Sequence, residues 1–321
     1  MQEINIDGKK VLPGKFTKIN ISISRLPSDT LIDLNVFAYR GKLPGPTLLL
    51  TGGVHGDEIN GIEIIRRLIS EDQIMPDRGM VIAIPLVNVY GFIYNSRDLP
   101  DGKDLNRCFP GSEHGSLANR LAYILIKKIV PYVDYGVDFH TGGAKISNFP
   151  QIRCLTDNEK NIEFASAFGA PFTINSNLID KSFRKETTKM GKTFMVFEGG
   201  ESLRLDENSI YEGKTGVYRL IQHLNMRDYG LLPQYTKILK ETTWMRAKVS
   251  GIFNTSVQSG MKVYKNQTLA VITDPYGKSN IVIKSPFEGF IIGINNMPVV
   301  NAGDALIHLG SEKTQKYLSE K

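Results

Sequence analysis

The side chains of this sequence that are best suited to metal chemistry begin in the segment Gly53-Val-His-Gly-Asp-Glu58, where His55 and Glu58 are three residues apart. Residues at this spacing lie on one face of a helix, so an imidazole and a carboxylate can reach the same ion. An H-x-x-E pair also arises by chance, and Glu58 alone would suit the positive end of a helix dipole. The pair therefore needs support from the rest of the chain.

Two further polar side chains come at the ends of apolar runs. His140 follows Val-Asp-Phe and precedes Thr-Gly-Gly, and Glu198 follows Phe-Met-Val-Phe and precedes Gly-Gly. In open α/β sheets, ligands bind beyond the carboxyl ends of the strands, so we expect these side chains at the same rim as His55 and Glu58.

Two histidines and a carboxylate with one open position are typical of a catalytic zinc site. The sequence therefore predicts one Zn²⁺ per chain, held by His55, Glu58 and His140. A carboxylate beside such a site can take a proton from metal-activated water and pass it on, and we assign this role to Glu198. An ion pair that only stabilises the fold is the alternative for Glu198. The other histidines, His114, His223 and His308, are expected to be packing or surface residues.

A long segment between the first two metal-binding segments is rich in arginine and asparagine. Arginine binds carboxylates through two hydrogen bonds, and an amide adds a donor, so Asn106 and Arg107 are predicted to hold a substrate carboxylate. Arg97 is predicted to stabilise the oxyanion that forms at a carbonyl under attack. The alternative is a set of salt bridges that stiffen the loop, with Asp98, Asp101 and Asp104 as partners.

These side chains need a sheet to position them, and the apolar pattern predicts one. Strands are expected at 46–53, 80–87, 132–139, 151–155, 171–174 and 192–197, and helices from residue 59 to about 69 and at 116–130, 158–170 and 215–224. Continuous apolar strands that alternate with helices indicate an α/β fold, with a mostly parallel or mixed sheet and helices on both faces.

After about residue 241 the helical spacing disappears, and short β-type runs separated by glycine or proline replace it. Two similar half-patterns predict a small all-β barrel or sandwich. We therefore expect a catalytic domain over residues 1–240 and a C-terminal β domain over 241–321, with the boundary near 236–246. The second domain is too short and too rich in turns for us to expect that it extends the first sheet.

Composition excludes several classes of protein. The 321 residues are 41% hydrophobic and 22% charged, which is ordinary for a globular protein. No apolar run is long enough for a membrane helix, and the N-terminus lacks the apolar core of a signal peptide. Two cysteines make no disulfide scaffold, so we expect a cytoplasmic protein. The formal net charge is +6, but no motif or basic aromatic stretch for nucleic acid occurs, so we expect no nucleic-acid partner.

Four motifs carry a family resemblance: HGDE, RxLPDGxDLNRxFPG, DFHTG and FEGG, in this order. Together they resemble the succinylglutamate desuccinylase/aspartoacylase family, which is related to the M14 zinc carboxypeptidases, over roughly residues 35–225. The resemblance implies a carboxypeptidase-like fold with the zinc ligands and the acid–base glutamate named above. It also implies that Arg97, Asn106 and Arg107 bind the substrate carboxylate and the oxyanion.

Family members also supply a further arginine, for which Arg184 is a candidate, and a tyrosine, which Tyr94, Tyr211 and Tyr218 leave open. Asp57, Asp104 and Asp138 match the motifs, and we expect them to support other side chains. The C-terminal part resembles a biotinyl/lipoyl-type barrel without the carrier's lysine signature, so we expect it to cap the site or to contact another copy.

The function expected from this resemblance is zinc-dependent hydrolysis of the amide bond of a small N-acyl amino acid. The alternative is a zinc metallocarboxypeptidase that acts on short peptides or peptidoglycan fragments. A non-catalytic metal-binding module is a third hypothesis, which the complete set of ligands and Glu198 argues against. The partner expected is the small-molecule substrate, with no membrane partner and with a homo-oligomer left open. The acyl group and the amino acid are not specified by the motifs.

Overall fold

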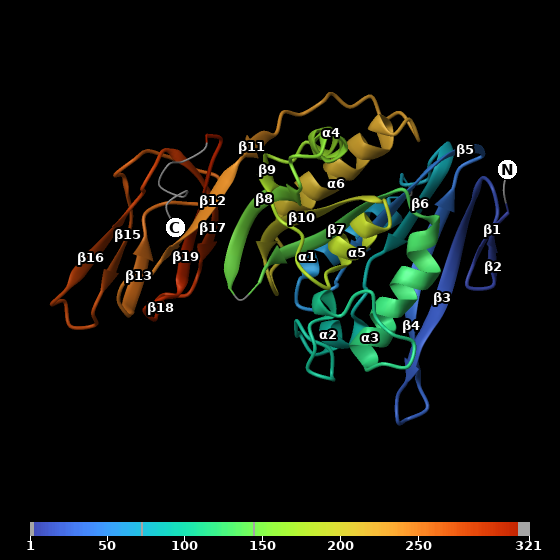
Figure 1. Ribbon diagram of the computed structural model, residues 1–321, viewed down its shortest axis with the longest axis horizontal. Coiled ribbons are helices and arrows are strands. Elements are labelled where there is room, and N and C mark those ends of the chain that lie inside the picture. The colour runs from blue at the N-terminus through green and yellow to red at the C-terminus, as the bar shows by residue number, and fades with distance from the viewer. Residues whose placement is uncertain (1–2, 72, 144, 314–321) are drawn as a thin grey trace.

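The computed structural model describes residues 3–71, 73–143 and 145–313. The molecule is elongated, with the N-terminal strands toward one end and the C-terminal strands at the other (Figure 1). Its helices are α1 (Ile59–Ser70), α2 (Val89–Ile93), α3 (Leu117–Ile124), α4 (Glu159–Phe168), α5 (Phe183–Lys189) and α6 (Glu207–His223). No helix in these ranges is long and apolar enough to cross a membrane.

The strands before residue 240 are β1 (Ile4–Ile6), β2 (Lys9–Val11), β3 (Lys15–Arg25), β4 (Leu31–Arg40), β5 (Leu43–Gly52), β6 (Arg78–Ile84), β7 (Tyr135–Gly142), β8 (Ile146–Cys154), β9 (Phe172–Asn175), β10 (Thr193–Glu201) and β11 (Lys237–Leu239). In the middle of the main sheet, β10, β7, β5 and β6 are neighbours and run parallel. On either side, β8 and β4 are antiparallel to this centre. The expected α/β fold is confirmed as a mixed sheet with a parallel core.

Both faces of the main sheet are covered, because its central strands are apolar on both sides. On β5, Leu48 and Leu50 belong to one buried cluster and Leu49 belongs to another. The first cluster includes side chains of α1, α4 and α6, and the second includes side chains of α3 and α5. This two-sided burial matches the continuous apolar runs from which the sheet was predicted.

The helix expected at 116–130 is a composite. It begins as α3, continues as a π-type turn at Leu125–Ile129 and ends as a 3-10 turn at Val130–Tyr132. Pro131 lies in that last turn. Because a proline has no N–H to donate and its ring clashes with the preceding turn, a regular α-helix cannot continue through this position.

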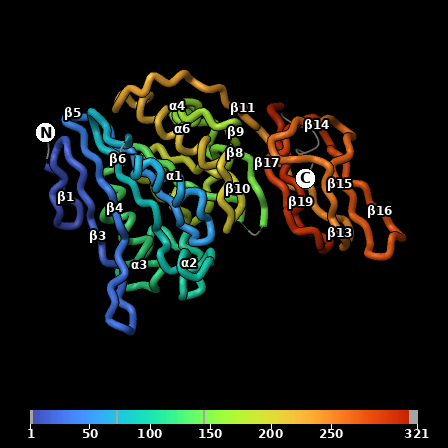
Figure 2. Tube along the Cα trace, turned by 180° about the vertical axis from the view of Figure 1, so that it is seen from behind, coloured from blue at the N-terminus to red at the C-terminus, as the bar shows by residue number. Residues whose placement is uncertain are grey.

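The C-terminal strands are β12 (Glu241–Arg246), β13 (Gly251–Thr255), β14 (Lys262–Val263), β15 (Thr268–Thr273), β16 (Asn280–Lys284), β17 (Gly289–Asn295), β18 (Val299–Val300) and β19 (Ala305–Ser311). Strands β16, β15, β13 and β18 form a separate sheet, whereas β17, β19 and β12 join the main sheet through the pairing of β17 with β8. The expectation that this part would not extend the first sheet is therefore wrong. Figure 2 shows β17 beside β8 from behind.

The reason for this continuity is that β9 pairs with only the second half of β8, which leaves the edge of its first three residues available. Residues Ile146, Ser147 and Asn148 pair with β17, whereas the other half of β8 pairs with β9. An unpaired strand edge is a template for a further strand, and β17 occupies it. The C-terminal strands have their own buried cluster, which includes Phe253, Leu269 and Leu306.

Candidate metal centre and substrate pocket

The first metal-binding segment is a tight turn between β5 and α1. Gly53 has a φ of +60°, which favours glycine, and a Cβ on Gly56 would lie 1.9 Å from the backbone of Gly91. These two glycines allow the chain to turn directly at the strand end. His55 lies in that turn, and Glu58 is the N-cap residue of α1.

His140 and Glu198 come from the two neighbouring parallel strands. His140 lies near the carboxyl end of β7, two residues before the strand ends at Gly142, and Glu198 is its direct partner on β10. Because β5, β7 and β10 run parallel, their carboxyl ends lie at one edge of the sheet, as expected from the sequence.

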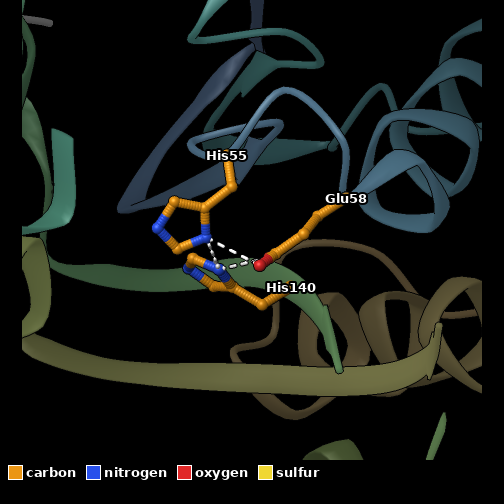
Figure 3. Close-up of side chains that lie close together, drawn as sticks. All are labelled: His55, Glu58 and His140. Atoms are coloured by element: carbon orange, nitrogen blue, oxygen red, sulfur yellow. Dashed lines mark hydrogen bonds and ion pairs between the residues drawn. The ribbon is translucent and has the colours of Figure 1, made fainter. Parts of the chain in front are cut away.

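Three buried side chains meet at this edge (Figure 3). The Nδ1 atom of His55 lies 2.8 Å from Glu58 Oε1, and the Nδ1 atom of His140 lies 2.7 Å from Glu58 Oε2. The two Nδ1 atoms are 3.2 Å apart. Within the described residues, His55, Glu58 and His140 are the group whose ligand atoms all lie within 4.8 Å of one another. The structure thus brings together the three predicted ligands.

The other nitrogen of each imidazole faces a second carboxylate. His55 Nε2 lies 3.2 Å from Asp104 Oδ1, and His140 Nε2 lies 2.8 Å from Asp138 Oδ2. Asp138 is fixed in turn by the hydroxyl of Thr51, which donates to its Oδ1 at 2.7 Å. Carboxylates in this position orient metal-binding histidines and make them more basic. The supporting role expected of Asp104 and Asp138 is therefore matched by their contacts.

The charges in this cluster perturb one another strongly. Burial alone would raise the pKa of Glu58, but the positive charges of His55 and His140 hold it well below its ordinary value. Burial would lower the pKa of His140, but Asp138 and Glu58 raise it well above the ordinary value. A buried carboxylate that is ionised between two imidazoles is a donor set that fits a divalent cation such as Zn²⁺.

Arg97 lines the same pocket as the metal-binding cluster. Its Nη1 is 3.1 Å from Glu58 Oε1, and its Nε and Nη2 donate to Asp104 Oδ2 at 3.2 and 2.9 Å. Of the loop-stiffening salt bridges that the sequence offered as the alternative role of Arg97, the one with Asp104 is present. Its guanidinium also lines the pocket, beside the metal-binding side chains.

Asn106 and Arg107 line the same pocket. The backbone N–H of Phe183 donates to Asn106 Oδ1 at 2.8 Å, so the donor side of this amide is the side that a substrate can use. Arg107 Nη1 donates to the carbonyl of Asn106 at 2.7 Å. The pocket has a volume of about 230 Å³, which suits a small molecule.

Arg184 is buried and lines the pocket, but its donors are used by the protein. It donates to the carbonyls of Arg153, Ser176 and Asn177 and to the hydroxyl of Ser176. Burial lowers its pKa to about 10. Its contacts are those of a residue that holds neighbouring loops together.

The three tyrosines left open by the sequence do not line the described part of this pocket. Tyr94 and Tyr211 are exposed, and the hydroxyl of Tyr218 donates to Glu71 at 3.1 Å. None of the three contacts the metal-binding cluster within the described chain.

The pocket residues that were not predicted include Asn148 and Arg153 on β8 and Trp244 on β12. Asn148 Nδ2 donates to Glu198 Oε2 at 2.7 Å, and Arg153 Nη1 lies 3.2 Å from Glu198 Oε1. Arg153 is the strand partner of Val196, two residues before Glu198, and Asn148 is the partner of Gly200, two residues after it. A register shift between Glu198 and Gly200 lies between these two pairs, so no simple alternation within 146–154 indicates that both side chains reach the glutamate.

The mixed sheet with helices on both faces defines the class of this protein as an α/β protein, with its pocket at the carboxyl ends of the central strands. The family model described as "Succinylglutamate desuccinylase/Aspartoacylase catalytic domain" matches residues 44–224. The chain therefore belongs to the succinylglutamate desuccinylase/aspartoacylase family and is a hydrolase of that family. The expected family is confirmed.

Relatives of the chain match most of its length. An N-alpha-acetyl-L-2,4-diaminobutyric acid deacetylase of Halomonas elongata is 29% identical over 277 residues, which are 82% of this chain and 81% of that protein. The product-bound ectoine utilization protein EutE (DoeB) of Ruegeria pomeroyi has a TM-score of 0.82 at 23% identity, over 96% of this chain and 97% of that chain.

A succinylglutamate desuccinylase/aspartoacylase of Rhodobacter sphaeroides has a TM-score of 0.82 at 24% identity, over 98% of this chain and 99% of that chain. At these identities the two structures show a shared fold.

Proposed function

We propose that this chain is a zinc-dependent amidohydrolase that cleaves the amide bond of a small N-acyl amino acid. The observation that carries the proposal is the common pocket of Glu198, Arg97 and the cluster of His55, Glu58 and His140. The deacetylase of Halomonas elongata, whose name describes the removal of an acetyl group from an amino acid, supports it.

The metal would be held by His55, Glu58 and His140. Two imidazoles and one carboxylate suit Zn²⁺, and the carboxylates of Asp104 and Asp138 behind the imidazoles add support. Bound there, Zn²⁺ would supply Lewis-acid polarisation of the acyl carbonyl and activation of water.

The remaining steps belong to the protein's own side chains. Glu198 accepts the proton of the attacking water at its carboxylate and then gives it to the departing amine. The guanidinium of Arg97 faces the negative charge that develops on the carbonyl oxygen. Asn106 and Arg107 hold the substrate carboxylate, so that the amide carbon lies over the metal-binding cluster.

The small volume of the pocket supports a small substrate over a peptide. Trp244 of the C-terminal strands lines the pocket and narrows it on that side. We propose that residues 241–321, of which 241–313 are described, form a β domain that caps a catalytic domain of residues 1–240. Both Cys108 and Cys154 are free thiols, which supports the proposed cytoplasmic location.

A hydrolysis screen tests this function. N-acetyl, N-succinyl and other N-acyl amino acids are assayed beside short peptides, with the metal content measured on the same preparation. We expect turnover of N-acyl amino acids by zinc-loaded protein. Peptide hydrolysis alone would favour a carboxypeptidase, and bound zinc without any turnover would favour a binding module.

The Glu198→Gln variant tests the mechanism. With its metal content unchanged, it is expected to lose a factor of roughly 10²–10⁴ in kcat, because a proton acceptor and donor is removed. Glu201→Gln on the same strand is the matched control, since Glu201 accepts from Asn296 and lies outside the pocket lining. A metal-replete Glu198→Gln enzyme at the wild-type rate would contradict the mechanism.

A further inference from the structure

Both oxygens of the Glu198 carboxylate are held by side chains of one neighbouring strand, β8. Asn148 donates to Oε2 at 2.7 Å, and Arg153 Nη1 lies 3.2 Å from Oε1. Strand β8 runs antiparallel to β10, with a shift of register between Glu198 and Gly200. Because one partner comes from each side of this shift, the orientation of the carboxylate is set by the shape of β8.

A glycine of the C-terminal strands leaves the space that the Asn148 amide occupies. Gly293 on β17 is the direct partner of Asn148, and a Cβ on Gly293 would lie 2.5 Å from Asn148 Oδ1. Real Cβ atoms do not approach another heavy atom so closely, so any other residue at this position would displace the amide. The absence of a side chain at residue 293 therefore allows Asn148 to lie where it does.

The same row of partners continues across the sheet to the pocket wall. Gly293 pairs with His308 on its other side, and His308 pairs with Trp244. Asn148, Gly293, His308 and Trp244 thus lie on four neighbouring strands. This row of paired residues connects the C-terminal strands to the side chain beside Glu198.

The orientation of the Asn148 amide follows from its partners. A carboxylate accepts hydrogen bonds, so Nδ2 faces Glu198 and Oδ1 faces Gly293. Asn148 is buried, and Oδ1 has no hydrogen-bond partner among the described residues. A buried carbonyl oxygen without a partner destabilises a fold. A contribution to the stability of the fold therefore does not explain why an asparagine stands at this position, whereas its hydrogen bond to Glu198 does.

We propose that Asn148 is a positioning residue for Glu198 and that Gly293 of the C-terminal β segment sets its place. The inference rests on the proposed function, in which Glu198 accepts and returns a proton. Without the Nδ2 donor, Arg153 alone holds the carboxylate, which can then rotate about that contact and away from the attacking water. Substrate and metal are held by other residues, so the loss falls on kcat and leaves KM unchanged.

The Asn148→Asp variant tests the donor directly, because aspartate has the same shape and cannot donate to Glu198 when ionised. We expect its kcat to fall roughly 10–100-fold, as for the loss of a hydrogen bond to a charged group, with KM and zinc content unchanged. Asn148→Ala is expected to lose less, since it adds no repulsion. Asn148→Leu keeps the size of the side chain and adds neither a donor nor a charge. If Asn148 served only to fill space, Asn148→Leu would retain the wild-type kcat, and this result would overturn the proposal.

A double-mutant cycle tests the part played by Gly293. Gly293→Ala is expected to lower kcat in the wild-type background and to cause no further loss in the Asn148→Ala background, where the methyl group has room. Additive losses would overturn the coupling. Gly251→Ala is the matched control: its Cβ would lie 2.5 Å from the carbonyl oxygen of Thr273, in the separate C-terminal sheet, and kcat is expected to stay unchanged.

Crystal structures separate this proposal from the proposed function. In Asn148→Leu, which removes the donor without adding a charge, the Glu198 carboxylate is expected to be rotated away from residue 148 relative to the wild type. An unmoved carboxylate overturns the positioning role, whatever the activity. A wild-type enzyme that hydrolyses no N-acyl amino acid contradicts the proposed function instead, and the two crystal structures still decide the role of Asn148.

Discussion

Trp244 lies face to face with His308, with ring centroids 4.5 Å apart and ring planes 6° from parallel. The two residues are direct partners on β12 and β19. Trp244 lines the pocket that contains the metal-binding cluster, whereas His308 is buried. The stack therefore fixes one wall of the pocket to the C-terminal strands.

Substrate binding is expected to change the tryptophan fluorescence of the protein. Trp244 is the only tryptophan in the sequence, so the whole emission reports on this wall. A titration with a non-hydrolysed substrate analogue should give a saturable change. Trp244→Ala is expected to raise KM roughly 10-fold by loss of an aromatic contact surface. Tyr276→Ala, which removes an exposed aromatic side chain of the same segment, should leave KM unchanged. Emission that stays constant at saturation would contradict the assignment.

The buried His308 predicts a loss of stability in mild acid. Burial, together with the positive charge of Arg153, lowers the pKa of His308 to about 3. In the unfolded chain a histidine has its ordinary pKa of about 6.5. The unfolded state therefore binds a proton between pH ~6.5 and ~3 that the folded state does not bind. The contribution of the neutral His308 to the free energy of unfolding is complete above pH ~6.5. It is lost as the pH falls below this value, by at most ~1.4 kcal/mol per pH unit.

Urea unfolding between pH 6.5 and 4.5 checks this expectation. The free energy of unfolding should fall less steeply with decreasing pH in His308→Gln than in the wild type, because glutamine does not titrate. The exposed His114 supplies the control, and His114→Gln should keep the wild-type slope. Equal slopes for all three proteins would show that His308 is not the group responsible.

Removing the charge behind His140 should weaken metal binding. Asp138 lies 2.8 Å from His140 Nε2 and accepts from Thr51, and Asp138→Asn keeps its shape without its charge. The affinity for zinc, measured by competition with a chelator, is expected to fall roughly 10–100-fold. Asp134→Asn is the matched control, because Asp134 directly precedes β7, at the end of that strand opposite His140, and accepts from the backbone N–H of Thr47. Unchanged affinity in Asp138→Asn would mean that the carboxylate does not support the metal.

Much of the candidate site could be predicted because its residues lie in short contiguous motifs. The spacing of His55 and Glu58 and the strand-end positions of His140 and Glu198 are local properties of the chain. Asn148, Arg153 and Trp244 are different, since their places depend on the register of β8 against β10 and on strands joined from residue 241 onward. Such pairings between distant segments are not encoded in any one stretch of sequence.

The helix expected at 215–224 shows a similar limit. The helix α6 begins at Glu207, and Gly213 and Gly216 lie inside it. Because glycine has a low helix propensity, local sequence preference does not predict the first part of α6 as helical. In the structure a Cβ on Gly213 would lie 2.4 Å from Ile64, and one on Gly216 would lie 2.3 Å from Phe168. Close packing against α1 and α4 thus requires the two glycines.

The N-terminal strands were not predicted, although β3 carries the signal. Its residues Ile19, Ile21 and Ile23 alternate with exposed positions and are all buried. This period of two indicates a strand with one covered face.

The two parts of the chain are expected to unfold together. Strand β17 pairs with β8, and a buried cluster of Phe172, Ile174, Leu239 and Ile292 joins strands from both sides of residue 240. Separating the C-terminal strands from the rest would expose this cluster and the edge of β8.

Two signals follow the two parts of the chain. Trp244 fluorescence reports on the C-terminal strands, and far-ultraviolet circular dichroism reports mainly on the helices, which all lie before residue 224 in the described chain.

Thermal unfolding of the metal-loaded protein should therefore give coincident transitions by the two signals. Ile292→Ala should lower the free energy of unfolding by roughly 2–5 kcal/mol, because it leaves a cavity in the shared cluster, and should move both transitions together. Val282→Ala removes an exposed side chain of β16 and is expected to change stability by less than ~0.5 kcal/mol. If the fluorescence transition alone moved in Ile292→Ala, the two parts would unfold independently, and the continuous sheet would contribute little to their cooperativity.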